Sequence, residues 1–319
     1  RGRRGWMCGY TEPVQEVRVV TPSKVNLALR VGALRPDGFH PLDTVFEALD
    51  LHDEVIVRGS DSLTLRIEGE GANVLPVDSA NLAIRAAQAL RDEADAPRLG
   101  AEMTIRKAIP VAGGMAGGSS DAAGALVALN ALWGLGLSSA DLQRIGSRLG
   151  SDVPFCLMGG IAHGTGRGEI LTPVYPGGEH AWVLLTNPVG LSTPAVFREF
   201  DRLEPRRLAD AASTGEPAST HELREAVTRG DLPAMASLMA NDLQTAAFSL
   251  RPDLAEVVER ADRLGATPIL SGSGPTVALL ASNAAQADRL ALRAALEWPG
   301  LGVVRAGGPA AGTHVAEVK

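Results

Sequence analysis

The chain has 319 residues, enough for one large or two ordinary domains, and its 45% hydrophobic and 21% charged residues are typical of a globular protein. The formal net charge of -7 argues against a nucleic-acid or anionic-membrane partner, because those surfaces demand a basic face. No apolar run reaches the length of a membrane span. The two cysteines, Cys8 and Cys156, are too few for a metal cluster. So few cysteines fit a reducing cytoplasm, although the sequence leaves open a single long-range disulfide between them.

The start of the chain is basic and glycine-rich, from Arg1 to Gly5, and lacks the apolar core of a signal peptide. We expect residues 1–16 to lie outside the fold, either as a remnant of production or as a disordered leader. A short arm that binds nucleic acid is the functional alternative, but so few basic residues more often form a solvated segment.

The first third of the chain alternates apolar and polar residues, which is the period of half-buried strands. Turns are expected at Pro36-Asp37-Gly38 and Gly59-Ser60-Asp61. A helix capped by Asp78 or Ser79 follows. The expected strands cover residues 17–20, 24–31, 44–49, 54–58 and 63–68. The sequence therefore predicts a β-rich sheet with helices behind it.

The most informative segment runs from Ile109 to Ala123, where a strand leads through four glycines into Ser119-Ser120 and a helix of small residues. Glycines let the backbone approach an anion, and the unpaired amides and dipole of the first helical turn attract it. The loop lacks the Gly-Lys-Ser or Gly-Lys-Thr of a Walker A motif and the G-x-G-x-x-G of a dinucleotide fold. A flexible glycine turn is the plain alternative. We interpret the loop as a phosphate cradle.

The rest of the chain predicts a second α+β half, with a boundary at Pro176-Gly177-Gly178. A helix opens at Ser138 and ends at Leu149-Gly150, and further helices are expected to be capped at Ser192, Ser219 and Asp231. A second glycine loop runs from Ser271 to Thr276. Strands are expected from residue 161 and at 181–186, 268–270, 277–280 and 302–306, with a last helix at 284–297.

Two charged residues stand next to apolar runs. On strand alternation Lys24 shares a face with Asn26, which would suit a polar pocket wall, although a lysine in a strand is usually a solvated edge group. Asp152 is most simply a helix N-cap or a turn residue. A functional role for Asp152 requires a cation that keeps it ionised, and Lys24 would supply one if the fold brought the two together.

Two other segments raise the question of ligand binding. Phe39 and His40 follow a turn, and an aromatic ring beside an imidazole can stack on and hydrogen-bond a heterocycle, with turn packing as the alternative. Residues 164–169 look like a nucleotide motif, but no helix pattern follows them. We therefore predict a hairpin turn there.

From Val17 onwards, the motifs and their order along the chain resemble those of the GHMP kinase superfamily. The segment from Pro110 to Ala123 is similar to the signature Pro-x-x-x-Gly-Leu-Gly-Ser-Ser-x-Ala, and Ser271 to Pro275 is similar to the third, glycine-rich motif. Three segments resemble the members that act on 4-diphosphocytidyl-2-C-methyl-D-erythritol: residues 22–29 with 35–40, residues 150–155, and residues 192–197.

The resemblance implies an α+β fold of two domains. The N-terminal domain, residues 17–175, would be a β-rich sheet with helices, like domain 2 of ribosomal protein S5, and would bind ATP. The C-terminal domain, residues 176–319, would be ferredoxin-like.

The resemblance also implies roles for single residues. Lys24 and Asp152 match the catalytic pair, whereas Ala112 and Ala116 depart from glycines that are common in the ATP loop. That loop would comprise Pro110, Val111, Ala112, Gly113, Gly114, Met115, Ala116, Gly117, Gly118, Ser119 and Ser120. Substrate contacts would come from Asn26, Phe39, His40, Thr193 and Phe197, the third motif from Gly272, Ser273 and Gly274, and a Mg²⁺ ligand from Ser119 or Ser120.

The implied reaction is ATP-dependent phosphorylation of the substrate's 2-hydroxyl, with ATP and Mg²⁺ as cofactors, on the non-mevalonate route to isoprenoid precursors. The product would be the 2-phosphate with ADP, and the enzyme would be a cytoplasmic monomer or homodimer. A homoserine or mevalonate kinase is a second interpretation. A silent, sugar-sensing relative that binds ATP is a third, but it would be expected to lose the acid or the lysine, and this chain retains both.

Overall fold

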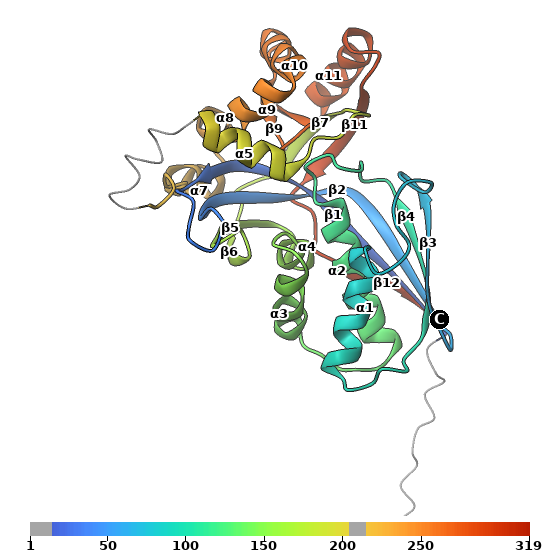
Figure 1. Ribbon diagram of the computed structural model, residues 1–319. Coiled ribbons are helices and arrows are strands. Elements are labelled where there is room, and N and C mark those ends of the chain that lie inside the picture. The colour runs from blue at the N-terminus through green and yellow to red at the C-terminus, as the bar shows by residue number, and fades with distance from the viewer. Residues whose placement is uncertain (1–14, 204–214) are drawn as a thin grey trace, which may run out of the picture.

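The computed structural model describes residues 15–203 and 215–319, which form two β-sheets with helices packed on them (Figure 1). Of the predicted leader, residues 1–14 lie outside the described part, as does Cys8, while Glu16 begins the first strand. Cys156 is a buried free thiol. Within the described ranges, no helix combines the length and apolarity that a membrane crossing requires.

The larger sheet is built on two long antiparallel strands, β1 (Glu16–Val31) and β2 (Leu42–Gly59). The sequence predicted each of them as two shorter strands. The structure joins the pieces and marks the break in β1 by a register shift between Pro22 and Ser23, with a second shift between Asn26 and Ala28. Such irregularities bend a strand and re-aim its side chains, so the intervening segment is turned away from regular sheet geometry.

The larger sheet has the central order β12-β1-β2-β4-β3, with β5 paired to β2 and β6, and β8 paired to β1. The β5–β6 hairpin confirms the turn that the sequence predicted at residues 164–169. Neither β8, of two residues, nor the fully exposed β12 was predicted, because neither carries a buried alternating face. These strands are β3 (Leu63–Gly69), β4 (Ala101–Lys107), β5 (Ile161–Thr165), β6 (Ile170–Val174), β8 (Ala240–Asn241) and β12 (His314–Val318).

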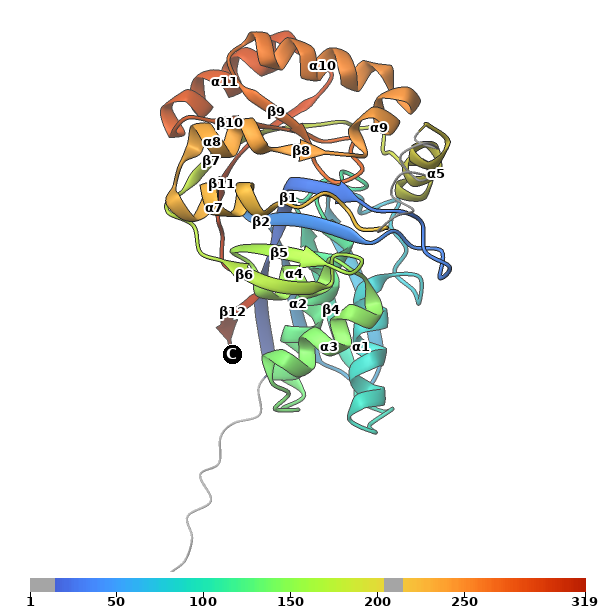
Figure 2. The same cartoon turned by 90° about the vertical axis from the view of Figure 1, so that its left-hand side faces the viewer.

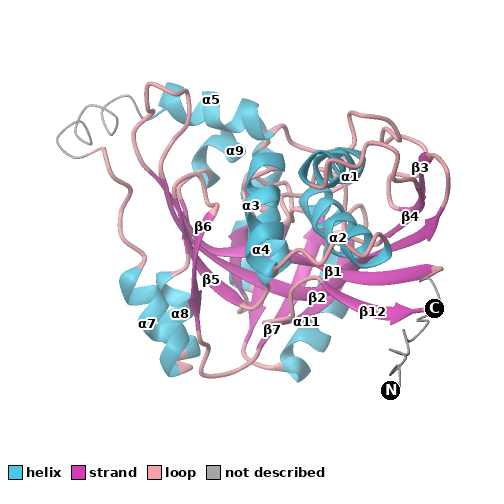
Figure 3. Cartoon of the chain, turned by 90° about the horizontal axis from the view of Figure 1, so that it is seen from below, coloured by secondary structure: helices cyan, strands magenta, loops and turns pink. Residues whose placement is uncertain are grey.

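Four helices pack together on one face of the larger sheet (Figure 3). They are α1 (Leu82–Glu93), α2 (Gly117–Leu132), α3 (Ser139–Leu149) and α4 (Val153–Met158). The predicted cap of α1 at Asp78 or Ser79 was wrong: the cap is Asn81, whose side chain accepts from the Ala83 amide, while Asp78 closes the preceding turn. The predicted start of α3 is confirmed, since Ser138 and Asp141 form a capping box.

The smaller sheet is antiparallel, in the order β11-β7-β10-β9, and helices α10 and α11 cover its outer face (Figures 1 and 2). Its strands are β7 (His180–Thr186), β9 (Thr267–Leu270), β10 (Val277–Ala281) and β11 (Gly302–Gly308). The helices of this half are α5 (Thr193–Leu203), α7 (His221–Arg229), α8 (Leu232–Leu238), α9 (Gln244–Leu250), α10 (Pro252–Arg263) and α11 (Ala284–Glu297). Asp231 caps α8 as predicted, and Thr220 takes the cap position of α7 in place of the predicted Ser219.

A shared core joins the two sheets. Val25 and Leu27 of β1 pack in one buried cluster with Trp182 and Leu184 of β7. After β11 the chain returns to the larger sheet, where β12 pairs with β1. The division into domains at residues 175 and 176 stays a prediction.

Candidate active site

A cavity of about 920 Å³ lies between the glycine loop, the bent part of β1 and the helix α5. Its volume is within the range of small-molecule sites in proteins. Most of the residues singled out from the sequence line it, although they come from segments far apart in the chain. The lining includes Lys24, Asn26, Phe39, His40, Asp152, Thr193, Phe197, Gly272, Ser273 and residues 110–119.

The glycine loop is anchored through its carbonyl groups. The oxygens of residues 113–115 accept, in order, from the Thr276 amide at 3.3 Å, the Ser271 hydroxyl at 3.0 Å and the Lys24 amide at 3.3 Å. In a trans peptide the next N–H points the opposite way. The amides of residues 114–116 therefore point away from these anchors, and none of them donates to another group in the described part of the chain. Three free amides beside the start of α2 form a cradle for an anion.

The loop backbone takes left-handed conformations at three positions. Gly114 has a φ of +73°, and a Cβ added there would lie 2.1 Å from the Ser271 carbonyl oxygen. Ala112 and Ala116, with φ of 52° and 62°, are the two positions where alanine replaces the superfamily's glycine. Each alanine keeps the shape of a glycine loop at a cost of about 1–2 kcal/mol.

Lys24 is only 4% exposed, in the segment of β1 between the two register shifts. Its Nζ donates to Asn26 Oδ1 at 2.6 Å, and the Asn26 amide donates in turn to Thr44. Among the described residues no carboxylate forms an ion pair with this ammonium. Burial lowers the pKa of Lys24, and the charge of Asp152 opposes that shift. A buried ammonium with so little compensation is suited to an incoming anion.

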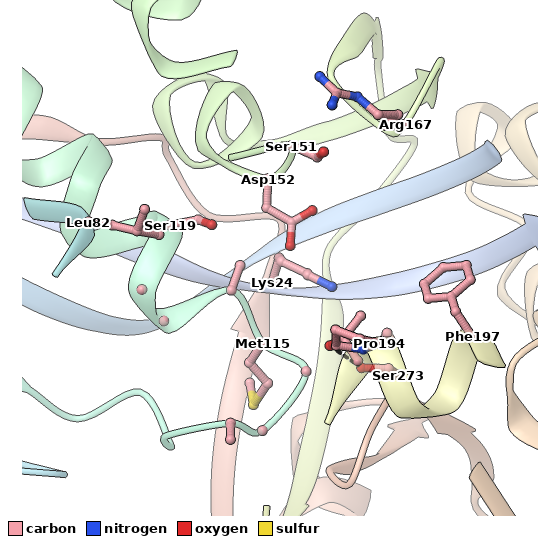
Figure 4. A pocket seen from close by; sticks show the side chains of 18 of the residues that line it. Lys24, Leu82, Met115, Ser119, Ser151, Asp152, Arg167, Pro194, Phe197 and Ser273 are labelled. Carbon is pink, nitrogen blue, oxygen red and sulfur yellow. Dashed lines mark hydrogen bonds between the residues drawn. The ribbon is translucent and has the colours of Figure 1, made fainter. Parts of the chain in front are cut away.

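Asp152 stands at the N-cap position of α4, but its side chain makes no capping hydrogen bond. The carboxylate instead points into the cavity toward the Lys24 ammonium (Figure 4). The helix-cap alternative therefore accounts for the backbone of Asp152 and not for its side chain. The structure brings together the two residues that the resemblance paired, and their catalytic role stays a prediction.

The two serines at the start of α2 have different surroundings. Ser120 is fully buried, its Oγ donates to the Pro22 carbonyl oxygen at 2.6 Å, and it does not line the cavity. Ser119 does line the cavity, close to the turn before Asp152, since a Cβ added at Gly150 would lie 3.6 Å from its Oγ. Of the two predicted metal ligands, Ser119 is the one placed to meet a ligand.

The second glycine loop closes the cavity beside Lys24. A Cβ added at Gly272 would lie 3.2 Å from Lys24 Nζ, so glycine leaves the ammonium unobstructed. Ser273 shares a hydrogen bond of 2.7 Å with the Thr193 hydroxyl, which ties this loop to α5. Gly274 packs behind the first loop and does not line the cavity.

Aromatic side chains gather at another part of the cavity. The rings of His40 and Phe197 are stacked, with centres 5.3 Å apart and planes inclined by 24°. Phe39 is 49% exposed, and the Arg167 guanidinium lies over its ring at 4.8 Å. Phe197 comes from α5 and His40 from the segment before β2, so only the fold brings them together.

Sequence reasoning missed a buried charge cluster beneath the first turn of α2. Lys107, 7% exposed, donates to Asp53 at 2.6 Å and to Asp121 at 2.7 Å. Asp53 also accepts from the amides of residues 108 and 109, where the glycine loop begins. Burial raises the pKa of Asp121 to about 7, against the opposing effect of Lys107. The available signal was an aspartate in a helix of small residues, one turn after the glycines.

Two family models match the chain: GHMP kinases N terminal domain over residues 81–160 and GHMP kinases C terminal over residues 223–300. A 4-diphosphocytidyl-2-C-methyl-D-erythritol kinase of Cutibacterium acnes is 48% identical over 307 residues, which are 94% of this chain and 96% of the relative. A protein of the same name from Salinispora arenicola is 50% identical over 305 residues, 93% of this chain and 94% of the relative.

Solved structures agree with these matches. The crystal structure of a 4-(cytidine 5'-diphospho)-2C-methyl-D-erythritol kinase superposes with a TM-score of 0.72 at 34% identity, over 91% of this chain and 99% of that one. A homoserine kinase from Cytophaga hutchinsonii gives a TM-score of 0.75 at 18% identity, over 96% of this chain and 99% of that one. At that identity the likeness shows the fold alone.

Proposed function

The chain belongs to the GHMP kinases, among the 4-diphosphocytidyl-2-C-methyl-D-erythritol kinases. We propose that Lys24 and Asp152 are its catalytic pair, beside which the phosphoryl group passes from ATP to the substrate's hydroxyl. The predicted two-domain α+β GHMP kinase fold and the predicted kinase activity in the methylerythritol phosphate route to isoprenoids are confirmed.

One observation carries the assignment of the pair. A buried ammonium without an ion-pair partner in the described structure and a carboxylate without a capping role face each other beside three free amides. The amides and the helix start would hold the phosphates of ATP. The Lys24 ammonium would balance the negative charge of the phosphate. A non-catalytic, sugar-sensing relative that only binds ATP would not need Lys24 and Asp152 to face each other.

Phosphoryl transfer asks the protein mainly for positioning and for stabilisation of charge. Asp152 would accept the proton of the attacking hydroxyl, or orient that hydroxyl for attack. Lys24 would keep Asp152 ionised and offset the charge that develops on the transferred group. The hydrogen bond to Asn26 fixes the ammonium in place before the substrate arrives.

The residues present fit a Mg²⁺ ion that arrives with ATP. The Ser119 hydroxyl lines the cavity beside the free amides, and an oxygen ligand of this kind suits Mg²⁺, which is held mostly by phosphates and a few protein oxygens. When bound, the ion supplies positive charge to the phosphate oxygens. Ser120 is already engaged with a backbone carbonyl and is not part of this proposal.

The substrate's base is proposed to lie at the aromatic part of the cavity. Phe39, His40 and Phe197 offer ring faces there, and a pyrimidine is a flat ring that stacks on such faces. Asn26 accepts from the Lys24 ammonium, and Thr193 is bonded to the second glycine loop, which lies beside Lys24, so both would contact the methylerythritol part. The cytoplasm is proposed as the location, and a monomer or homodimer as the assembly.

The direct test incubates the purified chain with Mg-ATP and the cytidylylated methylerythritol, followed by mass spectrometry of the products. A mass increase of one phosphoryl group on the substrate is expected, at the 2-hydroxyl. Homoserine and mevalonate serve as competing acceptors. Phosphorylation of either in preference to the cytidylylated substrate would contradict the substrate assignment.

Asp152→Asn tests the pair itself. The variant should fold and bind ATP nearly as the parent does, because the side chain caps no helix, while turnover should fall by roughly 10²-fold or more, the scale of a lost general base. Steady-state kinetics and calorimetric ATP binding measure the two effects. Asp92→Asn, on exposed α1 surface, is the matched control. Near-normal turnover in Asp152→Asn would reject the role.

A further inference from the structure

At the aromatic part of the cavity, helix α5 presents a carboxylate that the proposed mechanism does not use. Asp201 lies one turn after Phe197 and lines the same cavity. Its Oδ1 is 3.3 Å from Nε2 of His40, and its side chain is 30% exposed. A negatively charged group therefore borders the ring faces on which a base would stack.

The two oxygens of Asp201 are in different positions. Oδ1 is buried against His40, and its contact there lacks the geometry of a hydrogen bond to any described residue. Because Oδ1 is buried, the exposure of the side chain belongs to its other atoms, which include Oδ2. No donor from the described residues bonds to Oδ2. A carboxylate at the wall of a largely apolar cavity is costly unless it accepts hydrogen bonds, so it favours a ligand that donates one.

The surroundings hold the imidazole ring of His40, the neighbour of this carboxylate, in a fixed position. Nδ1 of His40 is 2.9 Å from the Gly32 carbonyl oxygen, which can only accept, so Nδ1 is the donor. The ring is stacked on Phe197 and packs edge-on against Phe200. Two aromatic rings and one hydrogen bond therefore fix the imidazole, and Asp201 lies at its other nitrogen.

We propose that Asp201 determines base specificity by accepting a hydrogen bond from the exocyclic amino group of the cytosine, an inference that rests on the proposed function. Cytosine carries an amino donor at the position where uracil carries a carbonyl acceptor. A carboxylate attracts the first and repels the second, so one residue both favours the correct base and disfavours the wrong one.

The test compares the cytidine substrate with its uridine counterpart in the full-length enzyme. In Asp201→Asn the amide can donate to the uracil carbonyl, so the ratio of kcat/KM for cytidine over uridine should fall by about 10- to 100-fold, the range of a lost charged hydrogen bond. In Asp201→Ala cytidine should lose affinity without a gain for uridine. The KM for ATP should stay unchanged in both variants.

A matched control and a second measurement separate the explanations. Glu199→Gln makes the same carboxylate-to-amide change on the same helix, at a side chain bonded to Arg202 and Ser249, and should leave the base ratio unchanged. Calorimetric binding of CDP and UDP, without ATP, should show the same shift in preference as the kinetics.

An unchanged base ratio in Asp201→Asn and Asp201→Ala would overturn the inference. Equal losses for both bases would also overturn it, since they would indicate that Asp201 only positions His40. If the parent enzyme does not phosphorylate the cytidine substrate at all, the proposed function fails instead, so the two failures can be told apart.

Discussion

Two buried lysines line the cavity, Lys24 on β1 and Lys107 at the end of β4, and they differ in their partners and in the direction in which their pKa is shifted. Lys107 donates to two carboxylates, and its pKa is raised by the charges of Asp121 and Asp53, which outweigh the effect of burial. Lys24 has an amide oxygen as its partner, and burial lowers its pKa.

The ammonium of Lys107 therefore stabilises the fold, whereas the ammonium of Lys24 is available to a ligand. Lys107 ties β2, β4 and the start of α2 into one unit, because Asp53 also receives the amides at the beginning of the glycine loop. Lys24 is held in place without being neutralised, which leaves its positive charge for a phosphate. The same side chain is thus structural at one position and functional at the other, according to what surrounds it.

Lys107→Met is expected to have the largest effect, a loss of about 3–5 kcal/mol in the free energy of unfolding, because two buried carboxylates lose their cation. Denaturant titration followed by circular dichroism measures it. The matched control is Lys24→Met, the same change at the other buried lysine. Equal destabilisation of the two variants would contradict the comparison.

Lys24→Met is expected to act on catalysis rather than on stability. Removing an uncompensated buried charge should change the free energy of unfolding by less than about 1 kcal/mol, or increase it. Turnover should fall by roughly 10²- to 10³-fold, the scale of a lost electrostatic stabiliser of the transition state. A variant with low activity and low stability together would show that Lys24 also holds the fold.

Asp121→Asn tests the charge cluster around Lys107 through the pH dependence of the free energy of unfolding. Burial raises the pKa of Asp121 to about 7, so its protonated form is favoured in the folded state. Its contribution to stability is therefore fully present below the unfolded value near 3.8 and is lost as the pH rises through about 7. Unfolding titrations at about pH 5 and about pH 8 should show the parent losing stability relative to Asp121→Asn. A constant difference between the two proteins would refute the coupling.

The glycine loop and the start of α2 were predictable because their signals are local. Glycines and serines at a strand-to-helix junction act through backbone freedom and free amides, and both are properties of neighbouring residues. Which of the two serines faces the cavity was not predictable. Successive helical residues point about 100° apart, and the packing that turns Ser120 toward Pro22 comes from β1.

Contacts between distant segments were beyond local reasoning. The charge cluster needed Asp53 from β2, Lys107 from β4 and Asp121 from α2. The facing of Lys24 and Asp152 was expected from the resemblance and not from their spacing. The bends in β1 escaped prediction because a register shift is set by the partner strand, and alternation alone suggested a break in the strand.

The smallest expected effect concerns the loop that lies between the two lysines. Its Met115 carbonyl oxygen accepts from the Lys24 amide, and a Cβ added at Gly117 would lie 3.5 Å from Lys107 Nζ. Ala116, between them, has a φ of 62°, where glycine avoids the strain that alanine carries. Ala116→Gly should therefore raise the free energy of unfolding, by up to about 1 kcal/mol once the greater chain entropy of glycine in the unfolded state is subtracted.

The matched control for this loop is the same change in ordinary helical backbone. Ala131→Gly, near the end of α2, should lower the free energy of unfolding by about 1 kcal/mol, so the two substitutions are expected to have opposite signs. Parallel denaturant titrations of both variants decide the matter. Destabilisation by Ala116→Gly as well would mean that the loop carries no strain at this position, and that the Ala116 methyl group contributes packing that outweighs its backbone cost.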